Sequence, residues 1–191
     1  MLKQQLSLAC LSVILLASTQ MVASQVFHLG RCPKDITTVQ DFNVTAYLGL
    51  WYEYAKYPFI FEAGGKCIQA EYGAKSDTQV TVLNTQTTIL NTKQSIEGVA
   101  TIEGPGKLSV TFTAIISLPG SSPYWVLATD YTSYAVVYSC TNLGLSHTQV
   151  VWILTRDRTP SAEIIKVAQD AITAKNLSLS YLEITDQSNC K

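Results

Sequence analysis

Hydrophobic and β-branched residues recur in short runs between residues 67 and 155, and turn-forming residues separate the runs. The runs are rich in Val, Ile, Thr and Tyr, as strands are. They read "QVTVLNTQTTIL", "QSIEGVATIE", "KLSVTFTAIIS", "YWVLATD", "YAVVYSC" and "QVVWILTR". In the break "EGPGK", Pro105 restricts φ and the flanking glycines accept positive φ, which favours a turn. Strands at this short, regular spacing predict an antiparallel sandwich or barrel.

Alternation within the runs indicates which residues share a face. In "QVVWILTR", the even positions from Trp152 to Arg156 lie on one face and the odd positions from Val151 to Thr155 on the other. Both faces are apolar, so we expect both to be covered. By the same alternation, the even positions from Tyr124 to Asp130 share one face.

One segment after the strands has a helical period instead. Thr159 is predicted to cap a helix with Pro160 at its first position, and Glu163 would lie near the positive end of the helix dipole. The predicted apolar stripe consists of Ile164, Val167, Ala168, Ala171 and Ile172 and ends near Asn176. A single amphipathic helix after a set of strands should pack on the outside of the sheet.

The first 24 residues have the layout of a secretory signal peptide. An early lysine precedes an apolar run from Leu6 to Ala17, and small residues follow at Ala23 and Ser24. The run is too short for a membrane span, and no later segment approaches about 20 apolar residues. We therefore expect a secreted, extracellular protein whose mature chain, residues 25–191, forms a single domain.

Charge and motifs exclude several classes of function. With Lys3 removed, 12 of the 13 basic residues remain against 14 acidic ones, and they are scattered, so nucleic acid is not expected as a partner. The two histidines, His28 and His147, lie in a terminal segment and a turn. The chain lacks a nucleophile elbow, a zinc-protease motif, an EF-hand loop and a dinucleotide fingerprint. We predict no catalytic residue and no metal site.

Four of the five cysteines remain after the signal peptide, namely Cys32, Cys67, Cys140 and Cys190. An even number in an exported chain predicts two disulfides, and the residues alone leave all three pairings open. Their spacings are too wide for a C-x-x-C redox site or a compact zinc cluster. Two sequons, at Asn43 and Asn176, are candidate glycosylation sites.

Three segments, in order, resemble the three signature regions of the lipocalin family. They are "YLGLWYE" with Gly49 and Trp51, "LATDYTSYAVVY" with Thr129, Asp130 and Tyr131, and "VWILTR" with Arg156. Further segments, among them "FHLGRCP", "FEAGGKCIQAEY" and "TDQSNC", are similar to the apolipoprotein D branch of that family. The resemblance covers essentially the whole mature chain.

The resemblance implies an all-β fold, an eight-stranded antiparallel up-and-down barrel that is open at one end and carries one C-terminal helix outside. It also implies that Trp51 closes the floor beneath Arg156, whose guanidinium would stack on the ring instead of lying in solvent. The implied disulfides are Cys32–Cys140 and Cys67–Cys190.

A barrel of this size holds one small ligand. The ligand-binding residues that the resemblance implies are Tyr72, Asn84, Gln86, Phe112, Tyr124, Tyr134, Tyr138 and Trp152. Each ring could instead be plain core packing. The set suits a carrier of a small hydrophobic ligand such as a fatty acid, sterol or retinoid, with no other cofactor. The alternatives are a carrier of a tetrapyrrole (bilin) pigment and, less favoured, an isomerase or a lipid-peroxide reductase. An isomerase would need a reactive cysteine, but all four mature cysteines are expected to form disulfides. A methionine-based peroxide reductase is disfavoured because no methionine follows Met21.

Phe59, Ile60 and Phe61 are predicted to lie in a loop at the barrel mouth. There they would either contact a lipoprotein or membrane surface or fold back as a lid. Apolipoprotein D has a further cysteine shortly after the position of Cys140, where this chain has Asn142. Covalent dimerisation is therefore not implied, and we expect a monomer.

Overall fold

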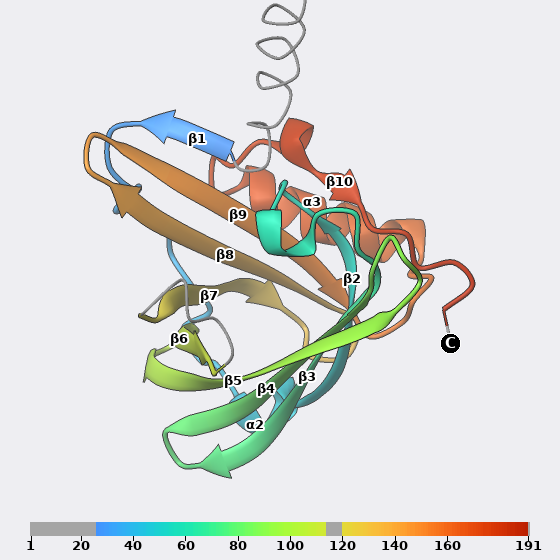
Figure 1. Ribbon diagram of the computed structural model, residues 1–191. Helices are drawn as coiled ribbons and strands as arrows, with labels where there is room; N and C mark the ends of the chain where they lie inside the picture. The colour runs from blue at the N-terminus through green and yellow to red at the C-terminus, as the bar shows by residue number, and fades with distance from the viewer. Residues whose placement is uncertain (1–25, 114–119, 191) are drawn as a thin grey trace, which may run out of the picture.

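Eight consecutive antiparallel strands form a closed barrel in the computed structural model, which describes residues 26–113 and 120–190 (Figure 1). The strands are β2 (Gly49–Lys56), β3 (Lys66–Ser76), β4 (Gln79–Thr87), β5 (Lys93–Gly104), β6 (Lys107–Phe112), β7 (Ser122–Thr129), β8 (Tyr134–Leu143) and β9 (Ser146–Thr155). Each pairs with the next, and β9 pairs back onto β2 to close the barrel. The predicted fold is confirmed. The predicted signal peptide, residues 1–24, lies outside the described residues.

The remaining elements extend or cover this barrel. β1 (Val26–Leu29) pairs with the first half of β9, and β10 (Glu183–Ile184) pairs with the end of β2. The helical elements are α2 (Val44–Tyr47), η1 (Ile60–Glu62), α3 (Ala162–Thr173) and η2 (Leu179–Tyr181). Of the helices in the described ranges, none is long and apolar enough to cross a membrane.

Two hydrophobic clusters cover the two faces of the barrel wall. One fills the lower barrel interior around Trp51, Val126 and Leu154. The other lies outside, where Val136 and Ile153 of the wall pack with α3. On β9, the even positions from Thr148 to Leu154 line the barrel interior, whereas Val151 and Ile153 pack outside, as the alternation predicts.

The helix begins later than predicted, and its buried stripe is rotated relative to the predicted one. Ser161, not Thr159, is the N-cap, and its side chain accepts a hydrogen bond from the amide of Ile164. The residues buried against the barrel are Ile165, Ala168 and Ile172. Val167 is 48% exposed, so its predicted place in the stripe is wrong. The spacing i, i+3, i+7 is satisfied by either stripe, and only packing against the wall distinguishes them.

A β-bulge breaks the predicted alternation along β7. The pairing with β8 shifts between Val126 and Ala128. Leu127 and Ala128 consequently both pack into the cluster beneath α3, while Val126 faces the interior. Ala128 therefore does not share the inner face of Tyr124, contrary to the simple period of two.

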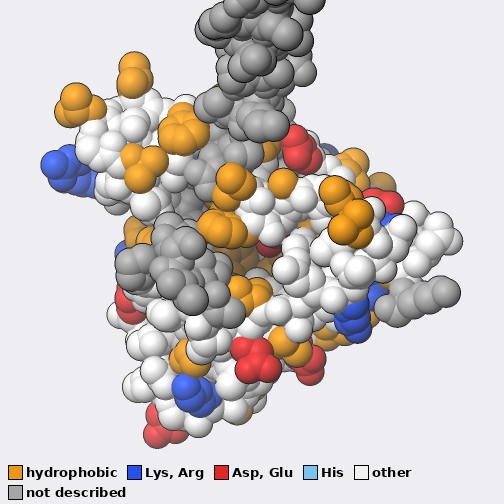
Figure 2. Space-filling view, viewed as in Figure 1, with side chains coloured by type: hydrophobic (Ala, Val, Ile, Leu, Met, Phe, Trp, Pro, Cys, Tyr) orange, Lys and Arg blue, Asp and Glu red, His pale blue; other side chains and the backbone are white. Residues whose placement is uncertain are grey.

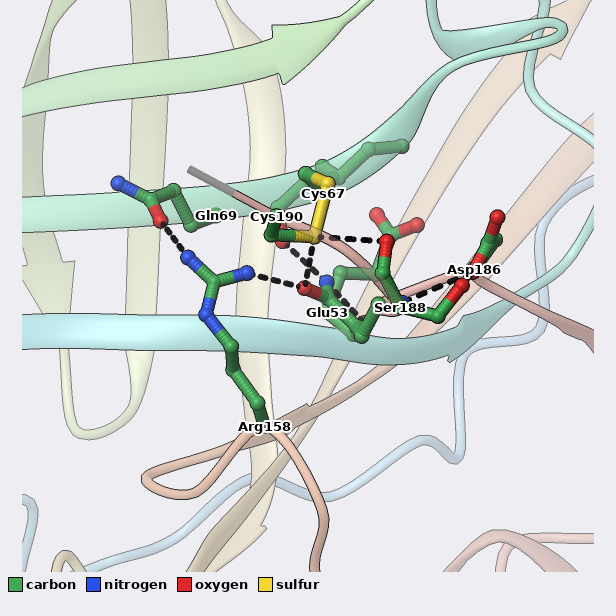
Figure 3. Close-up of a disulfide and its surroundings, with 9 residues drawn as sticks. Glu53, Cys67, Gln69, Arg158, Asp186, Ser188 and Cys190 are labelled. Atoms are coloured by element: carbon green, nitrogen blue, oxygen red, sulfur yellow. Dashed lines mark hydrogen bonds between the residues drawn. A yellow bond between two sulfur atoms is a disulfide. The ribbon is translucent and has the colours of Figure 1, made fainter.

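Two disulfides attach the chain ends to the barrel. Cys32–Cys140 joins the segment after β1 to β8, and Cys67–Cys190 joins the C-terminal tail to β3 (Figure 3). Both pairs are those that the resemblance implies. They span 108 and 123 residues, and closing loops of that length stabilises a fold by about 4–5 kcal/mol each in the chain-entropy model.

The tail fills a gap between two strands. β2 pairs with β3 only along Gly49–Tyr52, below the level of Glu53. Above that level, the Gln187 side-chain amide donates to the carbonyls of Glu53 (2.9 Å) and Ile68 (2.7 Å) and so bridges the strands. Arg158 in turn donates to the Gln187 side chain at 2.6 Å. The Cys67–Cys190 bond holds this plug in place.

Candidate functional site

The floor of the barrel is closed by Trp51 and Arg156. Trp51 is fully buried, and the guanidinium carbon of Arg156 lies 3.7 Å from its ring centroid. The guanidinium of Arg156 makes five hydrogen bonds, all to backbone carbonyl oxygens; the acceptors are Ala46, Tyr47, Leu48, Leu50 and Tyr131. This cation caps the barrel through the loop that contains α2 and does not reach the interior.

The turn between β7 and β8 supplies the other side of the floor. The Asp130 carboxylate accepts the amides of Thr132, Ser133 and Tyr134 at 3.1, 2.7 and 3.0 Å. Partial burial raises the pKa of Asp130, but these hydrogen bonds outweigh it and hold the pKa below its ordinary value. Thr129 accepts the amide of Tyr131, which has a positive φ of 68°. The carboxylate thus stabilises a turn that brings the Tyr131 carbonyl to Arg156.

Gly49 meets the same floor. Its φ is +92°, a conformation that residues with a side chain rarely adopt, and an added Cβ would lie 3.4 Å from Nη1 of Arg156. The three signature segments therefore converge on one structural constellation. Nothing in its geometry suggests chemistry.

Above the floor, the described residues enclose a cavity of about 400 Å³. Apolar side chains form most of its wall, among them Ile68, Ala70, Val82, Val110, Val137 and Leu154. A second lobe of about 360 Å³ adjoins it towards the β4–β5 connection and shares Phe59, Phe61 and Phe112 with it. A concave, mostly apolar space with a few polar groups is typical of a small-molecule site.

Six of the eight predicted ligand-binding residues line this space. Tyr72, Asn84, Phe112, Tyr124 and Trp152 line the deeper lobe, and Gln86 lines the outer one. The structure does not bring the other two, Tyr134 and Tyr138, together with them. Both pack in the cluster beneath α3, because Val137 and Ser139 take the inward positions of β8.

Two of the lining tyrosines already have hydrogen-bond partners. The Tyr124 hydroxyl lies 2.8 Å from that of Tyr47 and 2.7 Å from that of Tyr72. Burial raises the pKa of all three hydroxyls far above neutral, so they remain uncharged. Two hydrogen bonds join the three hydroxyls at the base of the cavity, so one of the three O–H groups has no acceptor among them.

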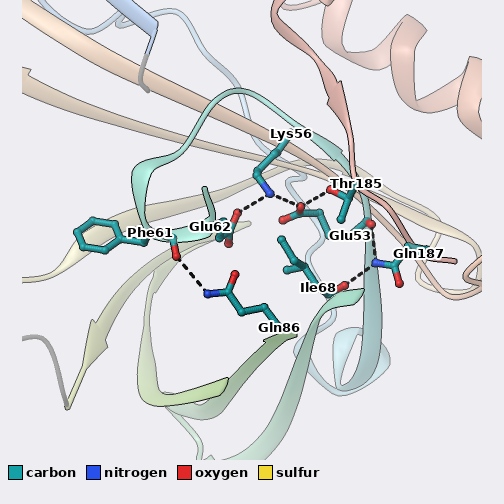
Figure 4. A network of polar contacts seen from close by, with 8 residues as sticks. All are labelled: Glu53, Lys56, Phe61, Glu62, Ile68, Gln86, Thr185 and Gln187. Atoms are coloured by element: carbon teal, nitrogen blue, oxygen red, sulfur yellow. Dashed lines mark hydrogen bonds and ion pairs between the residues drawn. The ribbon is translucent and has the colours of Figure 1, made fainter. Parts of the chain in front are cut away.

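A cluster of ionisable groups lies at the opposite end, beside the mouth (Figure 4). Nζ of Lys56 is 2.6 Å from Oε1 of Glu53 and 3.2 Å from Oε2 of Glu62. Thr185 of the tail also donates to Glu53. Burial, followed by the charge of Glu53, raises the pKa of Glu62 to about 8. The carboxylates outnumber the lysine here, so Glu62 retains its proton near neutral pH.

The β2–β3 connection forms part of the mouth. Phe59 turns inward and packs edge-to-face on Trp152, with ring centroids 5.6 Å apart. Ile60 and Phe61 are 54% and 45% exposed. Of the two predicted arrangements, Phe59 therefore adopts the lid and Ile60 the exposed tip, while Phe61 both lines the cavity and reaches solvent.

Sequence reasoning missed the polar members of this site. Glu53 alternates inward with Trp51 on β2, but an acid within a strand gives no signal of its partner. Lys56 and Glu62 come together with it only because η1 folds over the end of β2. Tyr47 was not predicted, because the short helix α2 has no recognisable sequence pattern.

Both sequon asparagines are exposed. Asn43 caps α2, its Oδ1 accepting the Ala46 amide at 3.0 Å, and Asn176 follows α3 with a φ of 57°. In the described ranges, no group of three His, Cys, Asp or Glu side chains is arranged to hold a metal ion.

Comparison with known proteins identifies the family. The model of the lipocalin / cytosolic fatty-acid binding protein family matches residues 48–189. The chain belongs to the lipocalin family. Among similar relatives, apolipoprotein D of Cavia porcellus is 44% identical over 170 residues, which cover 87% of each chain. The Lazarillo protein of Schistocerca americana is 36% identical and covers 81% of this chain and 74% of its own.

Solved lipocalin structures show the same barrel. Insecticyanin from the tobacco hornworm Manduca sexta superimposes with a TM-score of 0.78 at 29% identity, covering 86% of this lipocalin and 90% of its own chain. The predicted resemblance to the apolipoprotein D branch is confirmed. Proteins of this family typically bind and transport small hydrophobic molecules, and the enclosed apolar cavity agrees with that role.

Proposed function

We propose that this lipocalin is a secreted carrier that takes up one small hydrophobic molecule, a fatty acid, sterol or retinoid-like compound, in its barrel. The observation that carries the proposal is the mostly apolar cavity of about 400 Å³ inside the barrel, above the floor that Trp51 and Arg156 close. Its size matches the lower range of small-molecule sites. The two disulfides agree with an oxidising, extracellular location.

Burial of apolar surface supplies the driving force, at about 25 cal/mol per Å² removed from water. The rings of Phe112 on β6 and Trp152 on β9 offer flat contact surfaces in the wall. Because apolar side chains and rings form most of the deeper wall, the base favours the apolar end of a ligand. The polar end then lies towards the mouth, where Asn84, Gln86 and Glu62 line the wall.

Fluorescence titration tests the proposal. Trp152 lines the cavity, whereas Trp125 packs outside against Tyr138, with ring centroids 6.2 Å apart. Retinol should quench the fluorescence saturably in the wild type and in Trp125→Phe, but much less in Trp152→Phe. The absence of a saturable response to retinol and to arachidonate would refute the proposal. Strong visible absorption by protein purified from its source would assign the cavity to a tetrapyrrole instead.

We also propose that the open end contacts lipid surfaces, from which the ligand enters. Three mouth connections carry exposed apolar pairs, which we call the rim; the rim consists of Ile60, Phe61, Ile89, Leu90, Leu143 and Leu145. The exposed fractions reach 77% and 79% at Ile89 and Leu90 and 91% at Leu145. Hydrophobic side chains gather over the free ends of β1, β8 and β9 in Figure 2. Apolar surface concentrated at one end of a monomer is typical of an interaction site.

Glycans at Asn43 and Asn176 would leave this end free. Asn43 belongs to the α2 loop at the floor, and Asn176 follows α3 on the outer wall. We propose that both are used, and a mass decrease on enzymatic deglycosylation, lost stepwise in Asn43→Gln and Asn176→Gln, tests this.

A further inference from the structure

The charged groups in the cavity wall have one sign. Among the described residues that line either lobe, Glu53 and Glu62 are the acids, and none is Lys, Arg or His. Lys56 lies behind them, 2.6 and 3.2 Å from their carboxylate oxygens. The ammonium group of Lys56 thus forms ion pairs with both carboxylates. A ligand with an ionised carboxylate meets no free positive charge in this part of the wall.

Hydrogen-bond acceptors also dominate the uncharged groups here. The Gln86 amide nitrogen donates to the Phe61 carbonyl (3.4 Å) and the Gln94 side chain (3.2 Å), so its oxygen points elsewhere. The buried oxygens Oε1 of Gln86 and Oδ1 of Asn84 make no hydrogen bond within the described chain. Buried acceptors without donors favour a ligand that brings a donor.

We propose that Glu62 selects the ligand's head group: the cavity accepts an uncharged, hydroxyl-bearing head at any pH, but an ionised carboxylate only while Glu62 is protonated. The proposal rests on the ligand-carrier function proposed above and names the head group for it. A protonated Glu62 donates its O–H to a ligand carboxylate, whereas an ionised Glu62 repels it at close range in a site of low dielectric.

The surroundings leave Glu62 as the group that titrates in the neutral range. Burial and the charge of Glu53 raise the pKa of Glu62 to about 8. Burial lowers the pKa of Lys56, but the two carboxylates outweigh it, so this pKa is raised overall and the lysine stays charged. Tyr72 of β3 lies nearer the base, where burial raises its pKa far above neutral, and β4 contributes the uncharged Asn84 and Gln86. The tail contributes Thr185, which does not titrate.

A matched pair of ligands tests the proposal on the full chain with both disulfides. Retinol and retinoic acid differ only in the head group, and retinoic acid is ionised throughout pH 6.5–9.5 because a carboxyl ordinarily titrates near pH 4–5. Affinities are measured by quenching of Trp152 at both ends of this range. For a pKa of about 8, the protonated fraction of Glu62 falls about 30-fold over the range. Binding of retinoic acid should weaken about as much, and binding of retinol by less than about twofold.

Two variants distinguish the effect of a charge in the cavity from the effect of the net charge of the protein. Glu62→Gln should hold the ratio of the two dissociation constants within about threefold across the pH range, because the site no longer ionises. Glu71→Gln makes the same change in net charge on the exposed face of β3 and should behave as the wild type. A wild-type ratio that does not change with pH, or the same change in Glu62→Gln, would overturn the proposal.

A second measurement does not depend on a variant that folds. The carboxyl carbon of Glu62, followed by NMR in the wild type, should titrate near pH 8, and at a higher pH with retinoic acid bound but not with retinol. A midpoint that retinoic acid leaves unchanged would contradict the proposal. Saturable retinol binding with no discrimination would refute the head-group inference alone. Failure of both ligands to bind would refute the carrier function, and the inference with it.

Discussion

The floor and the mouth of this barrel are built on opposite plans. At the floor, the guanidinium of Arg156 makes five hydrogen bonds to backbone carbonyls and lies 3.7 Å from the ring centroid of a fully buried Trp51. At the mouth, buried oxygens of Asn84 and Gln86 make no hydrogen bond within the described chain. Exposed apolar side chains surround the opening there.

The difference shows that, in one small domain, the residues that stabilise the fold and those that bind a ligand lie at opposite ends. Polar groups at the floor satisfy one another, so the floor is rigid and has little capacity left for a ligand. Polar groups at the mouth include hydrogen-bond acceptors without a donor. This lowers the stability of the fold but leaves the acceptors available to a ligand. We therefore expect substitutions at the floor to act on folding, and those at the mouth on binding and on its pH dependence.

The largest effect should come from Trp51→Ala. Removing a fully buried tryptophan leaves a cavity under Arg156 and should lower the free energy of unfolding by about 3–5 kcal/mol, measured by urea denaturation. A loss below about 1 kcal/mol would mean that the floor does not carry the stability assigned to it.

Removing the Cys67–Cys190 disulfide, by Cys67→Ser with Cys190→Ser, should cost about 2–5 kcal/mol. It also frees the tail that holds Glu53 through Thr185 and Gln187, so retinol affinity should fall as well. The matched control, Cys32→Ser with Cys140→Ser, should lose similar stability with less effect on affinity. Equal effects of the two pairs on retinol binding would contradict a role for the tail at the mouth.

Glu62→Gln should change how stability depends on pH. The pKa of Glu62 in the folded protein, about 8, lies above its ordinary value of 4.5, so the folded state keeps a proton that the unfolded state loses. This contribution to stability is fully present below pH 4.5, is lost as the pH rises to about 8, and then stays constant.

The variant lacks this loss. Relative to wild type, it should gain about 4 kcal/mol of unfolding free energy between pH 4.5 and 8, as measured by urea denaturation at both pH values. If the unfolding free energies of the two proteins depended on pH in the same way, Glu62 would titrate normally. The mouth would then lack the protonated carboxyl that we propose there.

The smallest effect on stability should come from the rim. Ile89→Ser with Leu90→Ser changes side chains that are 77% and 79% exposed and should alter the unfolding free energy by less than about 0.5 kcal/mol. Binding to phospholipid vesicles, measured by flotation, should nevertheless fall about tenfold, because the apolar contact is lost. Val167→Ser on α3, where the side chain is 48% exposed, should leave flotation unchanged. An equal loss of vesicle binding in both variants would refute the proposal that the rim contacts lipid surfaces.

Much of the fold could be predicted from the sequence, because its signals are local. Runs of β-branched residues between turns predicted the strands, and a helical period predicted α3. The errors arose where packing overrides the period. At Ala128 a bulge shifts the alternation, and at the start of α3 Ser161 offers a cap two residues beyond Thr159. Tyr138 carries a ring suited to a pocket, but the register of β8 directs it beneath α3.

The sequence by itself determined the barrel, its floor and the family, because the signature residues act through backbone conformation and short-range contacts that each segment encodes. Gly49 has the φ that only glycine adopts readily, and Asp130 accepts the amides of its own turn. Only the tertiary structure decided the chemistry of the mouth. Glu53 and Thr185 are 132 residues apart, and Glu62 reaches Lys56 only because η1 folds over β2. A pKa depends on burial and on neighbouring charges in space, neither of which a local pattern records.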